Sequence, residues 1–99
     1  MKLANFEKMP TTMPDGIQVV LDFGKYHLSI IQSDFSYGGK QGKYEIGVFN
    51  ANDGVANSMT ELPGITAEND SVKGFLTEAD VDAIIKKMYT ITKKEPVQV

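Results

Sequence analysis

The sequence predicts an α+β domain in which an antiparallel β-sheet of three to five strands is packed by one C-terminal α-helix. Two observations support this prediction. Apolar and polar residues alternate over 17–50, and an apolar stripe with helical spacing follows a capping sequence near position 77. The chain of 99 residues suffices for one domain. We expect an irregular N-terminal arm over 1–16, the α+β domain over 17–92 and a frayed tail over 93–99.

Two strands of the predicted sheet form a hairpin. They run from Ile17 to Phe23 and from Tyr26 to Gln32, and their apolar residues fall on alternate positions. Gly24-Lys25 between them suits a tight turn, because glycine adopts the positive φ that such turns require. A third strand is predicted from Lys43 to Asn50, after a glycine-rich connector over 33–42.

The segments around these strands give weaker signals. Asn50 to Gly54 is typical of a turn, and Ser58–Leu62 is a short candidate strand that Pro63-Gly64 would end. In the arm, Met9-Pro10 and Met13-Pro14 disfavour helix, because a proline restricts the residue before it.

The helix has the clearest local signal in the chain. Thr77 is the predicted N-cap, Asp80 completes an acidic variant of the capping box, and Leu76 and Val81 occupy the hydrophobic staple positions. Glu95-Pro96 ends any helix. The stripe that faces the sheet consists of Val81, Ile84, Ile85 and Met88.

One helix covers only one face of such a sheet. The opposite face carries Val20 and Ile31, with Phe49 near the end of the third strand. Loops or a second copy of the chain would cover it, and the sequence leaves both readings open, including a homo-oligomer.

The composition argues against several classes of function. There is no cysteine, so disulfides and thiolate metal sites are excluded. All ten cationic residues are lysine and the net charge is −3, which disfavours a sequence-specific nucleic-acid reader, because arginine is the preferred contact to guanine and phosphate. No apolar run approaches the ~18 residues of a membrane span, and no secretory signal is recognisable. We expect a cytoplasmic protein.

The acidic residues concentrate in the second half of the chain. The stretch 53–82 contains seven of them and a single lysine, Lys73. This pattern suits an acidic face for a basic partner or an imitation of nucleic acid. It also suits solvated loops and the start of a helix, where acids complement the macrodipole.

No constellation of catalytic residues is recognisable, and we expect no enzyme, metal site or cofactor. His27 is the sole histidine, so histidine pairs and triads are excluded, and we expect it on the exposed polar face of its strand. The run from Gly38 to Lys43 lacks the spacing and the hydroxyl of a phosphate-binding loop. The residues before Gly54 lack the acids of a calcium-binding loop.

The connector over 33–42 provides the candidate site for a partner or ligand. Phe35 and Tyr37 are aromatic, and Lys40 and Lys43 follow among three glycines. Exposed aromatic side chains provide contact area at low entropic cost, and together with lysine they also suit a stacked base or a small anion. In the alternative interpretation, Phe35 and Tyr37 fold back against the sheet edge.

Two strings in the chain resemble those of small uncharacterised proteins of tailed bacteriophages. They are Tyr37-Gly38-Gly39-Lys40-x-Gly42-x-Tyr44-Glu45-x-x-Val48 and Asp70-x-Val72-x-Gly74-x-Leu76-Thr77-x-x-Asp80-Val81. The resemblance covers about residues 14–90, and this chain departs from the pattern by a longer segment over 51–70. It implies a phage accessory protein made in the host cytoplasm, and it brings no activity, cofactor or catalytic residue.

We therefore expect a protein that binds a host protein stoichiometrically, with a role in host takeover or against host defence. Two alternatives stay open. One is a small-molecule or nucleotide sponge that uses the aromatic residues and lysines of the connector. The other is a minor structural or assembly component of the virion.

Overall fold

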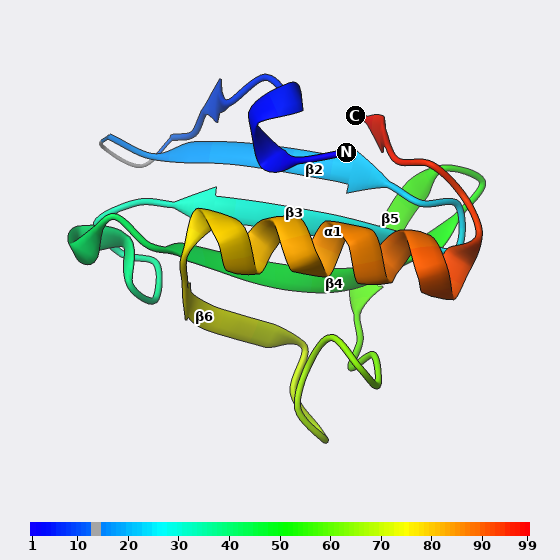
Figure 1. Ribbon diagram of the computed structural model, residues 1–99. Helices are drawn as coiled ribbons and strands as arrows, with labels where there is room; N and C mark the ends of the chain where they lie inside the picture. Colours follow the sequence, from blue (N-terminus) through cyan, green and yellow to red (C-terminus); the bar gives the residue numbers. More distant parts are fainter. Residues whose placement is uncertain (13–14) are drawn as a thin grey trace.

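The computed structural model describes residues 1–12 and 15–99, so the Met13-Pro14 pair lies outside the described residues. The chain forms a seven-stranded antiparallel sheet, and one long C-terminal helix lies across one of its faces (Figure 1). The α+β architecture is confirmed. The sheet has more strands than the three to five that we expected.

The sheet is built on a central meander, β2-β3-β4. Both outer edges of this meander carry two short strands: β1 and β7 pair with β2, whereas β5 and β6 pair with β4. The strands are β1 (Met9–Pro10), β2 (Ile17–Asp22), β3 (Tyr26–Gln32), β4 (Tyr44–Asn52), β5 (Val55–Met59), β6 (Val72–Leu76) and β7 (Val97–Gln98). The helices are the 3₁₀ turns η1 (Leu3–Asn5) and η2 (Gly39–Gln41) and the α-helix α1 (Glu78–Thr92).

Both tight hairpins have residues with positive φ in their turns. Gly24 has φ +87° between β2 and β3, where the hairpin was predicted. Between β4 and β5, Asp53 has φ +53° and Gly54 has φ +78°. Two consecutive positive φ values define a type I′ turn, whose twist matches that of the strands it joins. The turn signal at 50–54 is therefore confirmed at its last two residues, and β4 continues as far as Asn52.

The predicted helix start is confirmed. Thr77 is the N-cap, and its hydroxyl accepts a hydrogen bond from the Asp80 N–H at 3.1 Å. In return, the Asp80 carboxylate accepts the Thr77 N–H at 2.9 Å, which completes the capping box. The helix ends at Thr92, and Lys93 adopts φ +58° as its C-cap. The predicted stripe Val81, Ile84, Ile85 and Met88 is buried.

The hydrophobic core lies between α1 and the sheet. The inner face of the meander contributes side chains at alternate positions, as a strand period of two requires. Leu3, Leu62, Ile65 and Leu76 close the core around its rim. The buried apolar residues of the meander are Val19, Leu21, Leu28, Ile30, Tyr44, Ile46 and Val48.

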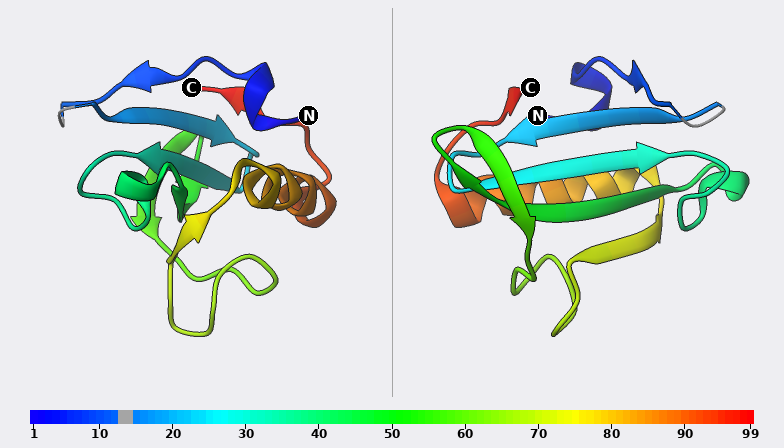
Figure 2. Two further views of the ribbon diagram at one scale, coloured as in Figure 1. Left: turned by 60° about the vertical axis from the view of Figure 1, so that its left-hand side comes forward. Right: turned by 180° about the vertical axis from the view of Figure 1, so that it is seen from behind.

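Both ends of the chain are attached to this core. In the segment where we expected an irregular arm, η1 buries Leu3 completely, and the Leu3 N–H donates to Asp82 Oδ1 of α1 at 2.8 Å. In the segment where we expected a frayed tail, β7 pairs with β2, and the Val99 N–H donates to the Val20 carbonyl at 3.0 Å. The two termini lie close together over the β2 edge (Figure 2).

The segment after β4 differs from the sequence-based expectation. The strand expected over Ser58–Leu62 starts earlier, as β5 (Val55–Met59), and leaves Leu62 to the core rim. Strand β6 was not predicted at all. It pairs with β4 through a bulge, because Tyr44 faces Leu76 whereas Ile46 faces Lys73.

Candidate functional site

The connector between β3 and β4 is a tightly bonded loop. The Ser33 N–H donates to Ser36 Oγ at 2.9 Å, and the Ser36 N–H donates to the Ser33 carbonyl at 3.2 Å. Gly39 packs so closely on this turn that a Cβ there would lie 1.6 Å from the Ser33 carbonyl oxygen. Only glycine fits such an approach. The backbone that carries the candidate residues is therefore well defined.

The predicted aromatic residues of this connector point into solvent. Phe35 is 74% exposed and Tyr37 is 62% exposed. This exposure favours a contact surface over the alternative interpretation, in which both rings fold back to cover the sheet edge. Exposed apolar side chains indicate a contact surface where several of them lie together.

The backbone of Tyr37, in contrast, is firmly attached to the sheet. Its N–H donates to Glu45 Oε1 at 2.7 Å, and its carbonyl accepts the N–H of Phe75 at 3.1 Å. The Cβ of Tyr37 lies directly over Gly74, where an added Cβ would come within 2.3 Å. Strand β6 thus fixes the position of Tyr37 while the ring stays exposed.

Phe75 is a third exposed aromatic residue beside Tyr37, and the sequence analysis did not find it. It is 56% exposed, and its φ of +58° lies in the left-handed region, which a bulky residue rarely adopts. One atom of its ring lies 3.2 Å from the position that a Cβ on Gly38 would occupy. Gly74 and Phe75 form the bulge opposite Glu45, and this bulge displaces Phe75 from the normal strand path.

We call Phe35, Tyr37 and Phe75 the aromatic surface: a backbone hydrogen bond joins Phe75 to Tyr37, and Phe35 is exposed two residues before Tyr37 in the same loop. The positive φ of Phe75 is a form of backbone strain that costs about 1–3 kcal/mol. Such strain persists only where the surrounding structure holds it, and it often occurs at functional sites. The sequence feature that could have indicated Phe75 is its solvent-facing position between Gly74 and Leu76. It could be recognised only once β6 was known to be a strand.

The two candidate lysines have different surroundings. Lys40 is exposed on η2, whereas Lys43 is half-buried, and its Cβ lies 3.0 Å from the position of a Cβ on Gly38. The structure therefore brings Tyr37, Phe75 and Lys43 together around Gly38. Lys40 lies on the outer side of the loop.

Lys43 also contributes to the electrostatics at the start of α1. Hydrogen bonds from the backbone and the hydroxyl of Thr77 hold the pKa of Asp80 below its usual value, and the charges of Lys73 and Lys43 act in the same direction. Lys43 therefore lies close enough to the start of α1 for its charge to act on Asp80. The lysines frame the aromatic surface but do not make it a strong anion site.

Tyr44, at the start of β4, is the second residue with a shifted pKa. Burial raises the pKa of its phenol, and the nearby negative charge of Glu78 raises it further. Its side chain belongs to the core, so Tyr44 has a structural role and is not part of the candidate site.

His27 was expected on an exposed polar face, and that expectation is wrong. It lies on the sheet face opposite α1, as predicted, but only 2% of it is exposed. Asp22 and Phe49 are its cross-strand neighbours, and the type I′ turn covers this corner, since a Cβ on Gly54 would lie 3.6 Å from Asp22 Oδ2. The β4–β5 hairpin, which is remote from β3 in the sequence, therefore buries His27, although the alternation pattern places this residue in solvent.

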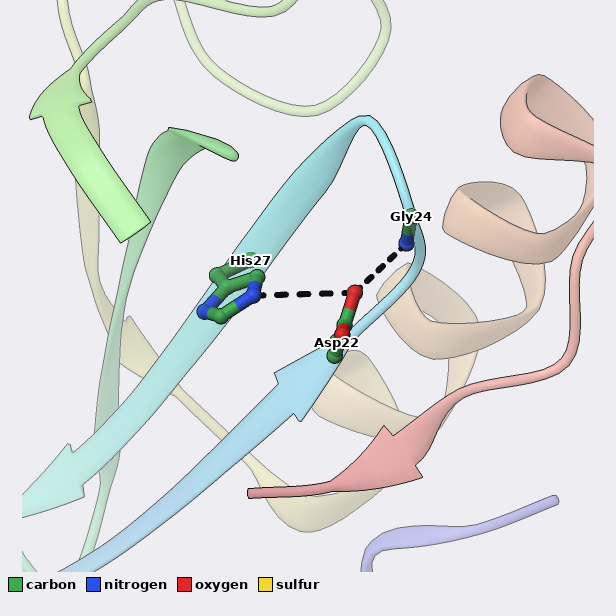
Figure 3. Close-up of polar contacts among 3 residues, drawn as sticks. All are labelled: Asp22, Gly24 and His27. Atoms are coloured by element: carbon green, nitrogen blue, oxygen red, sulfur yellow. Dashed lines mark hydrogen bonds and ion pairs between the residues drawn. The ribbon is translucent and has the colours of Figure 1, made fainter. Parts of the chain in front are cut away.

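The buried imidazole lies near the carboxylate of Asp22. His27 Nε2 lies 3.6 Å from Asp22 Oδ1, which is too long for a hydrogen bond, and among residues 1–12 and 15–99 Nε2 has no hydrogen-bond partner. The same Asp22 oxygen accepts the Gly24 N–H at 2.7 Å (Figure 3). Asp22 thus closes the β2–β3 turn, and Asp22 and His27 together have a structural role in this hairpin.

Residues 1–12 and 15–99 contain no group of three or more histidine, cysteine or acidic side chains arranged to hold a metal ion. Within the same ranges, no helix has the length and apolarity that crossing a membrane requires. No protein-family model, no curated protein and no solved structure matches this chain. The fold and the aromatic surface are therefore the basis for assigning a function.

Proposed function

We propose that this chain is a binding protein that forms a stoichiometric complex with another protein through the aromatic surface. The observation that carries the proposal is the exposure of Tyr37 and its neighbour Phe75, which a hydrogen bond and close glycine contacts hold in place, with Phe35 exposed two residues before Tyr37 in the same loop. Rigid exposed aromatic side chains are typical anchors of protein interfaces, because they bury large areas with little loss of entropy.

The resemblance to small proteins of tailed bacteriophages suggests which kind of partner this chain binds. We propose a host protein as the partner, met in the host cytoplasm during infection, with a role in host takeover or against host defence. The resemblance string that contains Tyr37 also contains Gly38 and Lys40, and the second string contains Gly74. The two sequence strings that carry the resemblance thus include Gly38 and Gly74, the glycines that pack against Phe75 and Tyr37.

A small-molecule or nucleotide sponge would use the same side chains. Ligand sites of that type enclose most of the surface of the ligand. Phe35, Tyr37 and Phe75 are 56–74% exposed as whole residues, which suits a partner that brings its own surface. A protein partner is therefore the better fit, and the role in virion structure remains an alternative that analysis of purified particles decides.

The proposal is tested by affinity capture from bacterial host lysate with matched variants. The triple variant Phe35→Ala, Tyr37→Ala, Phe75→Ala removes the aromatic surface. Tyr89→Ala is the control, because Tyr89 is 40% exposed on α1. We expect one host protein to be captured by the wild type and by Tyr89→Ala but lost from the triple variant. Equal capture by all three proteins would contradict the proposal.

A further inference from the structure

Strand β5 forms an outer edge of the sheet and is paired on one side only within residues 1–12 and 15–99 (Figures 1 and 2). All five of its residues are exposed, including Val55 at 63% and Met59 at 46%. The segment contains no charged residue and no proline, which are common devices that keep exposed edges from pairing. Its free side is therefore available to an incoming strand.

The hydrogen bonds of β4 show which backbone groups of β5 point outward. The Ala51 N–H donates to the Lys25 carbonyl at 3.0 Å, so it points away from β5. Ala51 lies directly opposite Ala56. Opposite residues of an antiparallel pair either exchange both hydrogen bonds or exchange neither. The N–H and C=O of Ala56 therefore point to the free side.

The same argument applies at the other end of β5. The Thr60 N–H donates to the Val48 carbonyl at 2.9 Å, which makes the adjacent pair of Phe49 and Met59 a pair without mutual hydrogen bonds. The backbone groups of Met59 thus also point outward. A bulge between these two pairs increases the local twist, and an incoming strand would follow that twist.

Charge decides which kind of strand fits. Asp53 and Glu61 flank β5, and both are exposed. Neither has a lysine within ion-pair distance in the part of the chain that the structure describes. Glu61 Oε2 accepts the Asn69 N–H at 2.6 Å, which fixes this carboxylate beside the end of the strand. Unmatched negative charge therefore stands at both ends of the free edge.

A second copy of this chain is a poor occupant. Antiparallel self-pairing centred on Asn57 would place Asp53 of one copy opposite Glu61 of the other, twice per dimer. Like charges in cross-strand positions are destabilising, and each chain carries a net charge of −3. We propose instead that the free edge of β5 binds an extended, lysine- or arginine-flanked segment of a partner polypeptide by antiparallel strand addition.

The test uses a defined probe and the exchange of single backbone amides. The probe is a blocked peptide of alternating valine and threonine with two lysines at each end, and the control peptide carries glutamates in place of lysines. At saturation, we expect the lysine peptide to slow hydrogen exchange of the Ala56 and Met59 amides by at least about tenfold. The glutamate peptide should leave both rates unchanged. Equal rates with and without the lysine peptide would overturn the proposal.

Two variants separate the backbone contribution from the charge contribution. Ala56→Pro removes the outward N–H without removing a bond to β4, and it should abolish the protection of the Met59 amide, whereas Ala56→Thr should retain it. The double variant Asp53→Asn, Glu61→Gln keeps the turn and the acceptor for Asn69, and it should weaken peptide binding by at least about threefold. Undiminished affinity in the double variant would contradict a basic partner. This test stays decisive even if Ala56→Pro fails to fold.

This surface is independent of the aromatic surface. The triple alanine variant of Phe35, Tyr37 and Phe75 should bind the lysine peptide as the wild type does. Sedimentation of the free protein adds a further check. A dimer that is lost in Ala56→Pro would show a second copy on this edge and would overturn the proposed occupant.

Discussion

The N–H of Phe75 donates a hydrogen bond of 3.1 Å to the carbonyl oxygen of Tyr37. This bond joins β6 to the connector between β3 and β4, two segments far apart in the sequence. It holds two exposed aromatic residues side by side, and both depend on glycine neighbours with no room for a side chain. The aromatic surface is therefore a product of tertiary structure, and its parts can be tested separately for stability and for binding.

Replacing Phe75 by glycine should remove an anchor without weakening the fold. The residue adopts φ +58°, which glycine accepts at no steric cost. Relief of this strain should offset the small loss of ring contacts, so we expect the free energy of unfolding to stay within about 1 kcal/mol of the wild type or to rise. Denaturant unfolding measures this, and a loss of more than that would show that the ring packs in the folded core.

Gly74→Ala should have the opposite effect on stability. The new Cβ would lie 2.3 Å from the Tyr37 Cβ, so the connector or β6 must move. We expect destabilisation of about 1–3 kcal/mol in denaturant unfolding, together with loss of the partner. Gly47→Ala is the matched control, because the nearest atom to its Cβ is the flexible end of Met59, at 3.1 Å, and the next two atoms lie at ordinary contact distances of 3.8 and 3.9 Å. If both variants were equally stable, the close packing of Tyr37 on β6 would be refuted.

The capping box makes a prediction with a pH dependence. Thr77→Ala removes the hydroxyl that accepts the Asp80 N–H and should cost about 1 kcal/mol, whereas Thr77→Ser should cost much less. Because the folded-state pKa of Asp80 is lowered, its contribution is present above the unfolded-state pKa and is lost as the pH falls through the folded-state pKa. Thermal unfolding between about pH 2 and 7 should therefore show a smaller acid loss in Asp80→Asn than in the wild type. Parallel profiles would contradict this assignment.

Tyr44 predicts a loss of stability at alkaline pH. Its folded-state pKa is raised by burial and by Glu78, so its phenol stays protonated when the unfolded chain has begun to ionise. The contribution is complete below the unfolded-state pKa of about 10 and is lost as the pH rises through the folded-state value. Tyr44→Phe should therefore lose less stability than the wild type between about pH 9 and 11. Comparing the two proteins cancels the titration of the lysines, and identical losses would contradict the assignment.

The elements that sequence reasoning predicted well are those with local signals. The β2–β3 hairpin, strand β4 and the start of α1 each follow from alternation, from Gly24 or from the Thr77–Asp80 capping box. Strand β6 has no such signal, because Gly74 and Phe75 interrupt its alternation at the bulge. Its pairing with β4 is set by contacts across a long loop, which propensity does not reveal.

The candidate site was predicted in part for the same reason. The composition of the connector indicated Phe35, Tyr37, Lys40 and Lys43, and the exposure of both aromatic residues agrees with a contact surface. Phe75 was missed because it lies on the unpredicted strand. The burial of His27 was missed because its cover comes from the β4–β5 turn, and no local pattern encodes how that hairpin folds back over the sheet.

Native mass spectrometry of the protein purified gently from a bacterial host tests the central claim most directly. The account predicts that the wild type carries one bound host polypeptide and that the triple variant Phe35→Ala, Tyr37→Ala, Phe75→Ala is isolated without it. The free energy of unfolding of the variant should stay within about 1 kcal/mol of the wild type. An added mass of a few hundred daltons on the wild type, or a bare chain in both preparations, would contradict a protein partner at the aromatic surface.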